Sequence, residues 1–216
     1  MSITTYAELQ TALSSWLHRT DVSTVAADLI KFGENTLNRK LRLFQMENVD
    51  TTITTSTSDR FATLPTGFIE AIDLTLYDDS YPQVLTQLPL SRINGRATDI
   101  STKPHYFAIS NNIIFDVISD EAYDCALRYY KKFDIATDLT NWLLTNYPEA
   151  YLYATLAYST TYLRDPGRIQ EHRAFLDEII RDLNRLDARS RGQAKMMVEP
   201  GLRMPRRSDI ISGDEL

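Results

Sequence analysis

The chain has 216 residues, of which 43% are hydrophobic and 24% are charged, and it carries a formal net charge of −6. This composition excludes a wholly disordered protein, because it supplies enough apolar material for a core. The negative charge excludes a chain that neutralises nucleic-acid phosphates over its whole surface. Seven glycines argue against a glycine-rich phosphate loop, and the one cysteine, Cys125, excludes an intrachain disulfide and a cysteine-based zinc cluster.

The sequence shows no secretory signal at its N-terminus and no segment that could span a membrane. The N-terminal residues MSITTYAELQ contain no basic region and no apolar region of a secretory signal. The most apolar stretch, residues 147–163, includes Glu149 and several tyrosines and threonines, and it is too short and too polar for a bilayer core of about 30 Å. We therefore expect a soluble protein that is made in a cytoplasm and has no membrane partner.

Two helices are predicted at the N-terminal end. Thr5 and Glu8 have the spacing of a capping box, which places the first turn of a helix directly after Thr5. A second helix is predicted from about Thr24 to Met46, with arginines and a lysine beside its apolar stripe. Gly33 inside this helix costs about 1 kcal/mol relative to alanine, a cost that close packing by a neighbouring helix can offset. The apolar stripe consists of Val25, Leu29, Phe32, Leu37, Leu41 and Phe44.

The middle third predicts a small antiparallel β unit. Its sequence is rich in threonine and other β-branched residues and is interrupted by proline, glycine and aspartate. Asn111 and Asn112 predict a hairpin turn, because asparagine tolerates positive φ. One short helical turn is predicted at residues 88–95. The predicted strands are residues 48–58, 61–64, 68–76, 84–85, 105–109, 113–117 and 122–132.

Two further helices follow the β unit. Asn146 is predicted to cap the first, with Pro148 in its first turn, and this helix extends to about residue 164. Leucines and alanines cover most of its circumference, which is typical of a central helix. Asp165 and Pro166 predict the start of the second, which ends near residues 191–192. Its apolar positions have the spacing of a coiled-coil seam: Ile169, His172, Leu176, Ile179, Leu183 and Leu186.

The predicted fold class is therefore α+β, with two helices before and two helices after an inserted antiparallel domain. Residues 1–47 and 140–191 form a helical bundle, residues 48–139 form the β-rich insertion, and residues 192–216 form an extended C-terminal arm. Residues 189–216 hold six basic and four acidic side chains, whereas residues 1–188 hold 17 basic and 25 acidic ones. The arm thus differs in charge from the rest of the chain.

The search for catalytic chemistry gives mostly negative results. No histidine has a metal-binding partner at helical spacing, and no nucleophile elbow or phosphate-binding loop is present. Cys125 alternates with apolar neighbours, which favours a buried structural thiol over a nucleophile. Adjacent acids at 78–79 and 120–121 are typical of solvated turns. We expect no enzyme activity, no catalytic residues, no metal and no cofactor. The histidines considered are His18, His105 and His172.

Two groups of residues remain candidates for binding a partner. The basic cluster of the tail can bind phosphates, can be a terminus without a partner, or can fold on a partner protein. A tyrosine face with 4-7-4 spacing is favoured as core over a subunit interface, although tyrosine is enriched at interfaces. The tail cluster is Arg203, Met204, Arg206 and Arg207, and the tyrosine face is Tyr147, Tyr151, Tyr158 and Tyr162.

Several segments resemble the head-to-tail adaptor (connector) proteins of tailed bacteriophages, including those of the tail-tubular-protein-A kind. The resemblance covers nearly the whole chain and rests on the order and spacing of structural motifs. The arginine-rich end of the chain is also similar to that family. The other segments that carry the resemblance are TTYAELQTALSSWLHRTD, GENTLNRKLRLFQME, LPTGFIEAIDL and TNWLLTNYPEAYLYATLAYSTTYLRDPGRI.

This resemblance implies a structural virion protein at the head–tail junction. Twelve copies would form a ring between the portal and the tail nozzle or tail tube, extend the DNA channel, and hold the portal through the C-terminal segment. DNA would pass through the ring without specific binding. The alternatives are a nucleic-acid-binding module that acts through the tail, a head-completion protein of different ring order, and an enzyme with an unrecognised carboxylate site.

Overall fold

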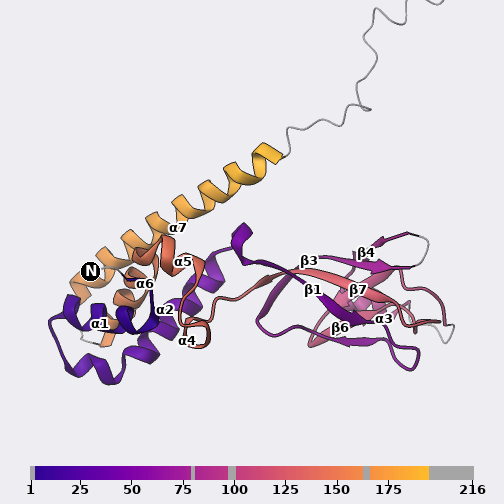
Figure 1. Cartoon of the computed structure of the whole chain (residues 1–216), viewed down its shortest axis with the longest axis horizontal. Helices are drawn as coiled ribbons and strands as arrows, with labels where there is room; N and C mark the ends of the chain where they lie inside the picture. Colours follow the sequence, from indigo (N-terminus) through magenta and orange to yellow (C-terminus); the bar gives the residue numbers. More distant parts are fainter. Residues whose placement is uncertain (1–2, 79–80, 97–100, 163–165, 195–216) are drawn as a thin grey trace, which may run out of the picture.

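Helices from both ends of the chain lie together at one end of the molecule, and the strands of its middle third lie at the other (Figure 1). The computed structural model describes residues 3–78, 81–96, 101–162 and 166–194, without the side chains of 160–162, 166 and 192–194. This arrangement confirms the α+β class. The α-helices are α1 (Tyr6–Leu17), α2 (Ala26–Lys40), α3 (Leu90–Asn94), α4 (Ile135–Asp138), α5 (Trp142–Asn146), α6 (Pro148–Tyr162) and α7 (Pro166–Ala194), with 3-10 turns η1 (Asp21–Thr24) and η2 (Phe44–Met46).

The predicted capping box at the start of α1 is confirmed. The Glu8 amide donates to the Thr5 hydroxyl at 3.3 Å, and the Glu8 carboxylate accepts from the Thr5 amide at 3.0 Å. These bonds satisfy two of the amides that a helix leaves without a partner in its first turn. The Thr4 amide and hydroxyl also donate to Glu8, which lowers the pKa of its carboxyl below the usual value.

The second helix is shorter than predicted. α2 ends at Lys40, and Leu41 adopts an extended backbone. Leu41 and Leu43 are buried, whereas Arg42 between them is only partly buried, so burial follows a period of two after the helix. The prediction of helix to Met46 was wrong because Leu37, Leu41 and Phe44 have helical spacing, whereas the alternation of Leu41 and Leu43 that the structure buries is that of an extended chain. Phe44, assigned to the helical stripe, is 60% exposed.

Seven strands form one sheet with the order β1-β7-β3-β4-β5-β6-β2. All neighbours are antiparallel except β4 and β5, which are parallel, so the prediction of a purely antiparallel unit was wrong at this pair. Its core contains Leu74, Leu127 and Phe107. The strands are β1 (Glu47–Thr54), β2 (Phe61–Thr63), β3 (Phe68–Tyr77), β4 (Gln83–Gln87), β5 (Tyr106–Ile109), β6 (Asn112–Phe115) and β7 (Asp124–Lys131).

The predicted hairpin forms between β5 and β6, but its turn differs in conformation from the prediction. Among the described residues, the non-glycine residues with positive φ are His18 and Leu139, so neither Asn111 nor Asn112 has it. The turn closes instead through the Ser110 amide, which donates to the Asn112 carbonyl at 3.0 Å.

α6 is the central helix, as predicted. It packs against α1, α2, α5 and α7, and its buried residues face in all directions. Asn146 does not cap it, because Asn146 is the last residue of α5 and donates to the Trp142 carbonyl. Asn141 is instead the N-cap of the preceding helix, α5, and its side chain accepts from the Leu144 amide at 2.9 Å. The structure thus contains a separate five-residue helix, α5, directly before the predicted long helix.

The apolar seam of α7 ends before the helix does. Leu176, Ile180 and Leu183 are buried against the other helices, whereas Leu186 is 47% exposed. Beyond Leu183 the helix continues toward the junction between the helices and the sheet (Figure 1). Leu186 was predicted to belong to the seam, but it is not part of the buried core of the helices.

Candidate functional site

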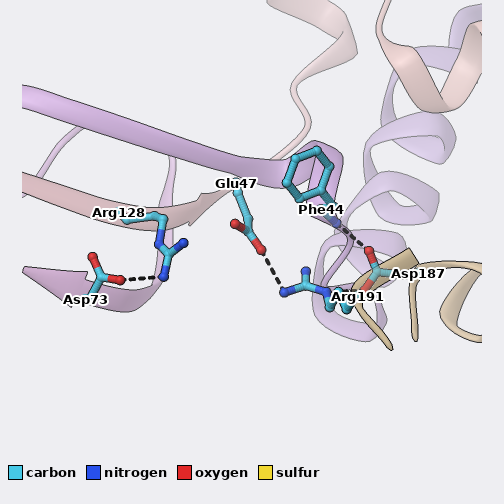
Figure 2. A network of polar contacts seen from close by, with 6 residues as sticks. All are labelled: Phe44, Glu47, Asp73, Arg128, Asp187 and Arg191. Carbon is cyan, nitrogen blue, oxygen red and sulfur yellow. Dashed lines mark hydrogen bonds and ion pairs between the residues drawn. The ribbon is translucent and has the colours of Figure 1, made fainter. Parts of the chain in front are cut away.

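The last part of α7 is joined to the start of the sheet by a network of polar contacts (Figure 2). Asp187 accepts a hydrogen bond from the backbone amide of Phe44 at 2.6 Å through its Oδ1. Its Oδ2 accepts from Nε of Arg191, one helical turn further on, also at 2.6 Å. Nη1 of Arg191 in turn lies 2.8 Å from Oε1 of Glu47, the first residue of β1. We call these four residues the α7 clamp.

The α7 clamp is partly shielded from water. The side chains of Glu47 and Asp187 are 12% and 10% exposed, and that of Arg191 is 39% exposed. The hydrogen bond to Asp187 raises the pKa of Arg191 above its usual value, so the guanidinium stays charged at any physiological pH. Charge-assisted hydrogen bonds of this kind are stronger than neutral ones.

An aromatic ring completes the junction. The guanidinium carbons of Arg191 and Arg42 each lie 5.9 Å from the centre of the Tyr130 ring, on β7. Arg42 also pairs with Glu70 of β3 at 3.0 Å. Further along the sheet, Arg128 and Asp73 are cross-strand partners on β7 and β3, and their side chains are 2.5 Å apart (Figure 2).

The local sequence explains why the clamp forms at this place. Leu41 and Leu43 enter the core and leave the Phe44 amide at the surface of the η2 turn, where it needs an acceptor. Asp187 and Arg191 are four residues apart, so they lie on the same face of α7, beyond the end of its apolar seam. The arrangement fixes the direction of α7 at the point from which residues 195–216 continue.

A second polar group lies inside the helices. Oε1 of Glu34 accepts from the Ile135 amide at 2.8 Å and from the Tyr151 hydroxyl at 2.9 Å. Asn141 donates to the same hydroxyl at 2.6 Å. Burial raises the pKa of the Glu34 carboxyl above its usual value, and burial together with the Glu34 charge raises that of Tyr151. This group ties α2 to the segment that leaves the sheet.

The residues predicted to bind a partner fall into two sets. Arg203, Met204, Arg206 and Arg207 lie outside the described residues. Within the tyrosine face, Tyr151 is fully buried and offers no surface to another chain, whereas Tyr147 and Tyr158 are partly buried. The side chain of Tyr162 also lies outside the described part. The subunit interface stays a prediction for the partly exposed tyrosines.

The residues that were considered for catalysis are buried or make contacts within the fold. Cys125 is buried, and burial raises the pKa of its thiol to about 12. Asp78 pairs with Lys103 at 2.9 Å, and Asp120 accepts from the Tyr123 hydroxyl at 3.0 Å. His105 lies 2.6 Å from the Gln83 amide, His18 ends α1, and His172 contacts the ring of Tyr153.

The described residues contain neither a metal-binding cluster nor a membrane-spanning helix. No group of three or more histidine, cysteine, aspartate or glutamate side chains there is arranged to hold a metal ion. No helix in the same ranges is long and apolar enough to cross a membrane.

Neither polar group was predicted from the sequence. Glu34 occupies a position of the apolar stripe of α2, four residues after Ile30 and three before Leu37, and an acid at such a position was a signal for a buried hydrogen-bonded carboxylate. Asp187 and Arg191 carried the weaker signal of an opposite-charge pair at i, i+4, which is common on exposed helices. Only the fold shows that Phe44 and Glu47 meet them.

Comparison with known proteins supplies the family. A search of curated proteins found no match to the chain. The model of the SU10 adaptor protein family matches residues 4–198, which include every described helix and strand. The match confirms the expectation of a phage adaptor protein, whereas the tail-tubular-protein-A kind stays a prediction. The chain belongs to the SU10 adaptor protein family.

Proposed function

We propose that this protein is one subunit of a ring that joins the portal to the tail nozzle or tail tube and extends the DNA channel. The observation that carries the proposal is the family match over residues 4–198. The four-part division into residues 1–47, 48–139, 140–191 and 192–216 belongs to the same proposal, with twelve copies in the ring.

The geometry supports a protein with two separate contact regions. The sheet lies at one end of the molecule (Figure 1), and the α7 clamp holds the last part of α7 to the start of β1. A rigid exit point suits a segment that must reach a fixed place on a partner, because less orientational freedom is lost on binding. We propose that residues 192–216 contact the portal and that the sheet faces the tail.

Charge favours protein over DNA as the partner of the tail. Twelve copies at −6 each carry −72 formal charges, and such a ring should not retain a passing polyanion. The arginines at 203, 206 and 207 are suited to acidic protein surfaces, where arginine forms bidentate hydrogen bonds.

Electron microscopy of the protein mixed with portal rings tests the proposal. We expect a second ring seated on the portal, and we expect its loss in the triple variant Arg203→Glu, Arg206→Glu, Arg207→Glu. The matched control carries the same charge change at three exposed residues of the body, Lys31, Arg92 and Arg181, and should still dock. Normal docking by the tail variant would refute the role of the arm.

A gel shift with duplex DNA separates the nucleic-acid alternative. Tight, salt-sensitive binding that the tail variant abolishes would favour a DNA-binding module instead. Size-exclusion chromatography with light scattering tests the oligomeric state of the free protein. We expect a monomer, because the contact between the arm and its partner forms only when the partner is present, and a stable free ring would contradict this part of the proposal.

A further inference from the structure

A groove with basic and aromatic walls lies where α2 meets the start of β3 and α6. Its volume is about 640 Å³, and none of the residues that line it is acidic. We call it the basic groove. Its lining includes three cations, Arg39, Arg42 and Lys132, and three aromatic rings, Phe32, Phe68 and Tyr158.

The aromatic part of the basic groove is exposed and already ordered. Phe32 is 50% exposed, although it lies on a helix whose other large apolar residues are buried. Its ring centre is 5.8 Å from that of Tyr158, and the Tyr158 hydroxyl is held by Thr36 at 2.7 Å. Rings fixed in this way bind a ligand with little loss of side-chain entropy.

Of the three cations of the groove, Arg39 makes no ion pair with a described residue, whereas Arg42 pairs with Glu70 outside the groove lining at 3.0 Å. The hydrogen bonds that Arg39 makes within the described residues go to the uncharged Asn35 carbonyl and Thr36 hydroxyl. Lys132 is half exposed and lies 3.5 Å from Asp134. On a chain with a net charge of −6 this surface is complementary to an acidic segment that also carries aliphatic side chains.

The chain itself contains such a segment. Residues 208–216, SDIISGDEL, hold three acids, no lysine or arginine, and three large aliphatic residues. The preceding residues 195–207 are basic, with one lysine and three arginines against one glutamate. The tail therefore has two halves of opposite charge, and only the second half matches the groove.

We propose that residues 208–216 bind in the basic groove of their own chain. The guanidinium carbons of Arg42, which lines the groove, and of Arg191, in the last turn of α7, each lie 5.9 Å from the Tyr130 ring centre, so they are at most 11.8 Å apart. Thirteen residues, 195–207, can span about 45 Å when extended, which is ample. A short connection gives an effective concentration in the millimolar range, which favours the chain's own groove over that of a second copy.

This contact is independent of the proposed function. It makes the groove unavailable to other acidic ligands in the free protein and holds residues 203–207 near the junction. A portal or any other partner that binds those arginines would have to compete with it, and the two halves of the tail can be tested separately.

Carbodiimide cross-linking of the full-length protein at low micromolar concentration tests the contact. The reagent joins amines and carboxylates that form ion pairs, so the Lys40–Asp177 pair at 2.6 Å and the Lys103–Asp78 pair at 2.9 Å serve as internal controls. We expect mass spectrometry of the monomer band to find Lys132 joined to Asp209, Asp214 or Glu215. Lys31, an exposed lysine of α2 that does not line the groove, supplies the background level of tail cross-links.

Variants of the groove and the tail make the test decisive. We expect Arg39→Glu to lower the Lys132–tail cross-link about tenfold, and Arg92→Glu, an equal charge change in α3, to leave it unchanged. Asp209→Arg combined with Arg39→Glu should restore the cross-link through Asp214 and Glu215. Circular dichroism verifies that each variant folds.

Three results would overturn the proposal. The first is a Lys132–tail yield no higher than the Lys31–tail yield while both internal controls react. The second is a cross-link found only between copies when ¹⁵N-labelled and unlabelled protein are mixed. The third is duplex DNA that binds the groove, with Arg39→Glu weakening DNA binding and leaving the tail cross-link intact.

Discussion

Gly33 of α2 lies directly against the backbone of Ala154 in α6. A Cβ atom at Gly33 would be 3.0 Å from the Ala154 carbonyl carbon and 3.0 Å from the Thr155 nitrogen. Real Cβ atoms are almost never this close to backbone, so the two helices can approach to this distance only at a glycine. The crossing unites the N-terminal helices with the central helix and thereby holds the two ends of the chain together.

Gly33→Ala should therefore destabilise the protein. The gain of about 1 kcal/mol in helix propensity is outweighed by overpacking, which costs about 1–3 kcal/mol, together with the separation of α2 from α6. We expect a lower urea midpoint with an unchanged slope. Gly95→Ala is the control, because its nearest neighbours would be 3.7 Å away, and a loss as large as that of Gly33→Ala would contradict the explanation.

Glu34→Gln and Glu34→Ala should have opposite effects. The amide oxygen of glutamine can accept from both Ile135 and Tyr151, and it removes a buried charge, so we expect stability at pH 7 equal to or above wild type. Alanine leaves a buried amide and a buried hydroxyl without their acceptor and should cost about 2–4 kcal/mol. Equal destabilisation by both would show that the negative charge is required.

The same carboxyl predicts a pH dependence. The Glu34 pKa is higher in the folded protein than its usual value of 4.5, so the folded state binds a proton more tightly than the unfolded state. The contribution of Glu34 to stability therefore falls as pH rises from about 4.5 through the raised folded pKa and is constant above it. Glu34→Gln should remove this part of the profile, measured as the difference from wild type in urea unfolding at several pH values.

Asp187 should hold the Phe44 amide independently of its charge. Asp187→Ala removes the acceptor of that amide and one partner of Arg191, with an expected cost of about 1–3 kcal/mol and loss of Phe44 amide protection in hydrogen exchange. Asp187→Asn keeps an acceptor oxygen and should retain the protection. Asp182→Ala, an exposed acid on the same helix paired with Arg185 at 3.4 Å, should change stability by less than about 0.5 kcal/mol.

Cys125 should report opening of the sheet. Its thiol is buried and its pKa is raised to about 12, so maleimide should not label the folded protein, even at pH 9. Labelling should follow the urea unfolding curve measured by circular dichroism. Rapid labelling under native conditions would mean that the strands around Cys125 open locally without global unfolding.

Prediction from the sequence was accurate where local chemistry decides. The Thr5–Glu8 capping box and Pro166 as the first residue of α7 depend on neighbouring residues alone. It was wrong at the end of α2, where residues after Lys40 fit a helical stripe and an extended strand equally well. Burial of Leu41 and Leu43 in the core of the helices favours the extended form. It was also wrong at Asn146, since two asparagines in one short stretch can both cap a helix.

The candidate sites, unlike the fold class, depend on contacts between distant parts of the chain. The sequence by itself determined the α+β class, the central position of α6 and the adaptor family, because apolar periodicity and the order of segments are properties of the chain. Only the tertiary structure decided that Asp187 meets Phe44, that Glu34 joins Tyr151, and that Arg39 and Lys132 share one groove with Phe32. Asp187 and Phe44 are 143 residues apart, and Glu34 and Tyr151 are 117 residues apart. Lys132 is likewise distant in sequence from Arg39 and Phe32 of α2, and no local preference of the chain encodes which distant surfaces pack together.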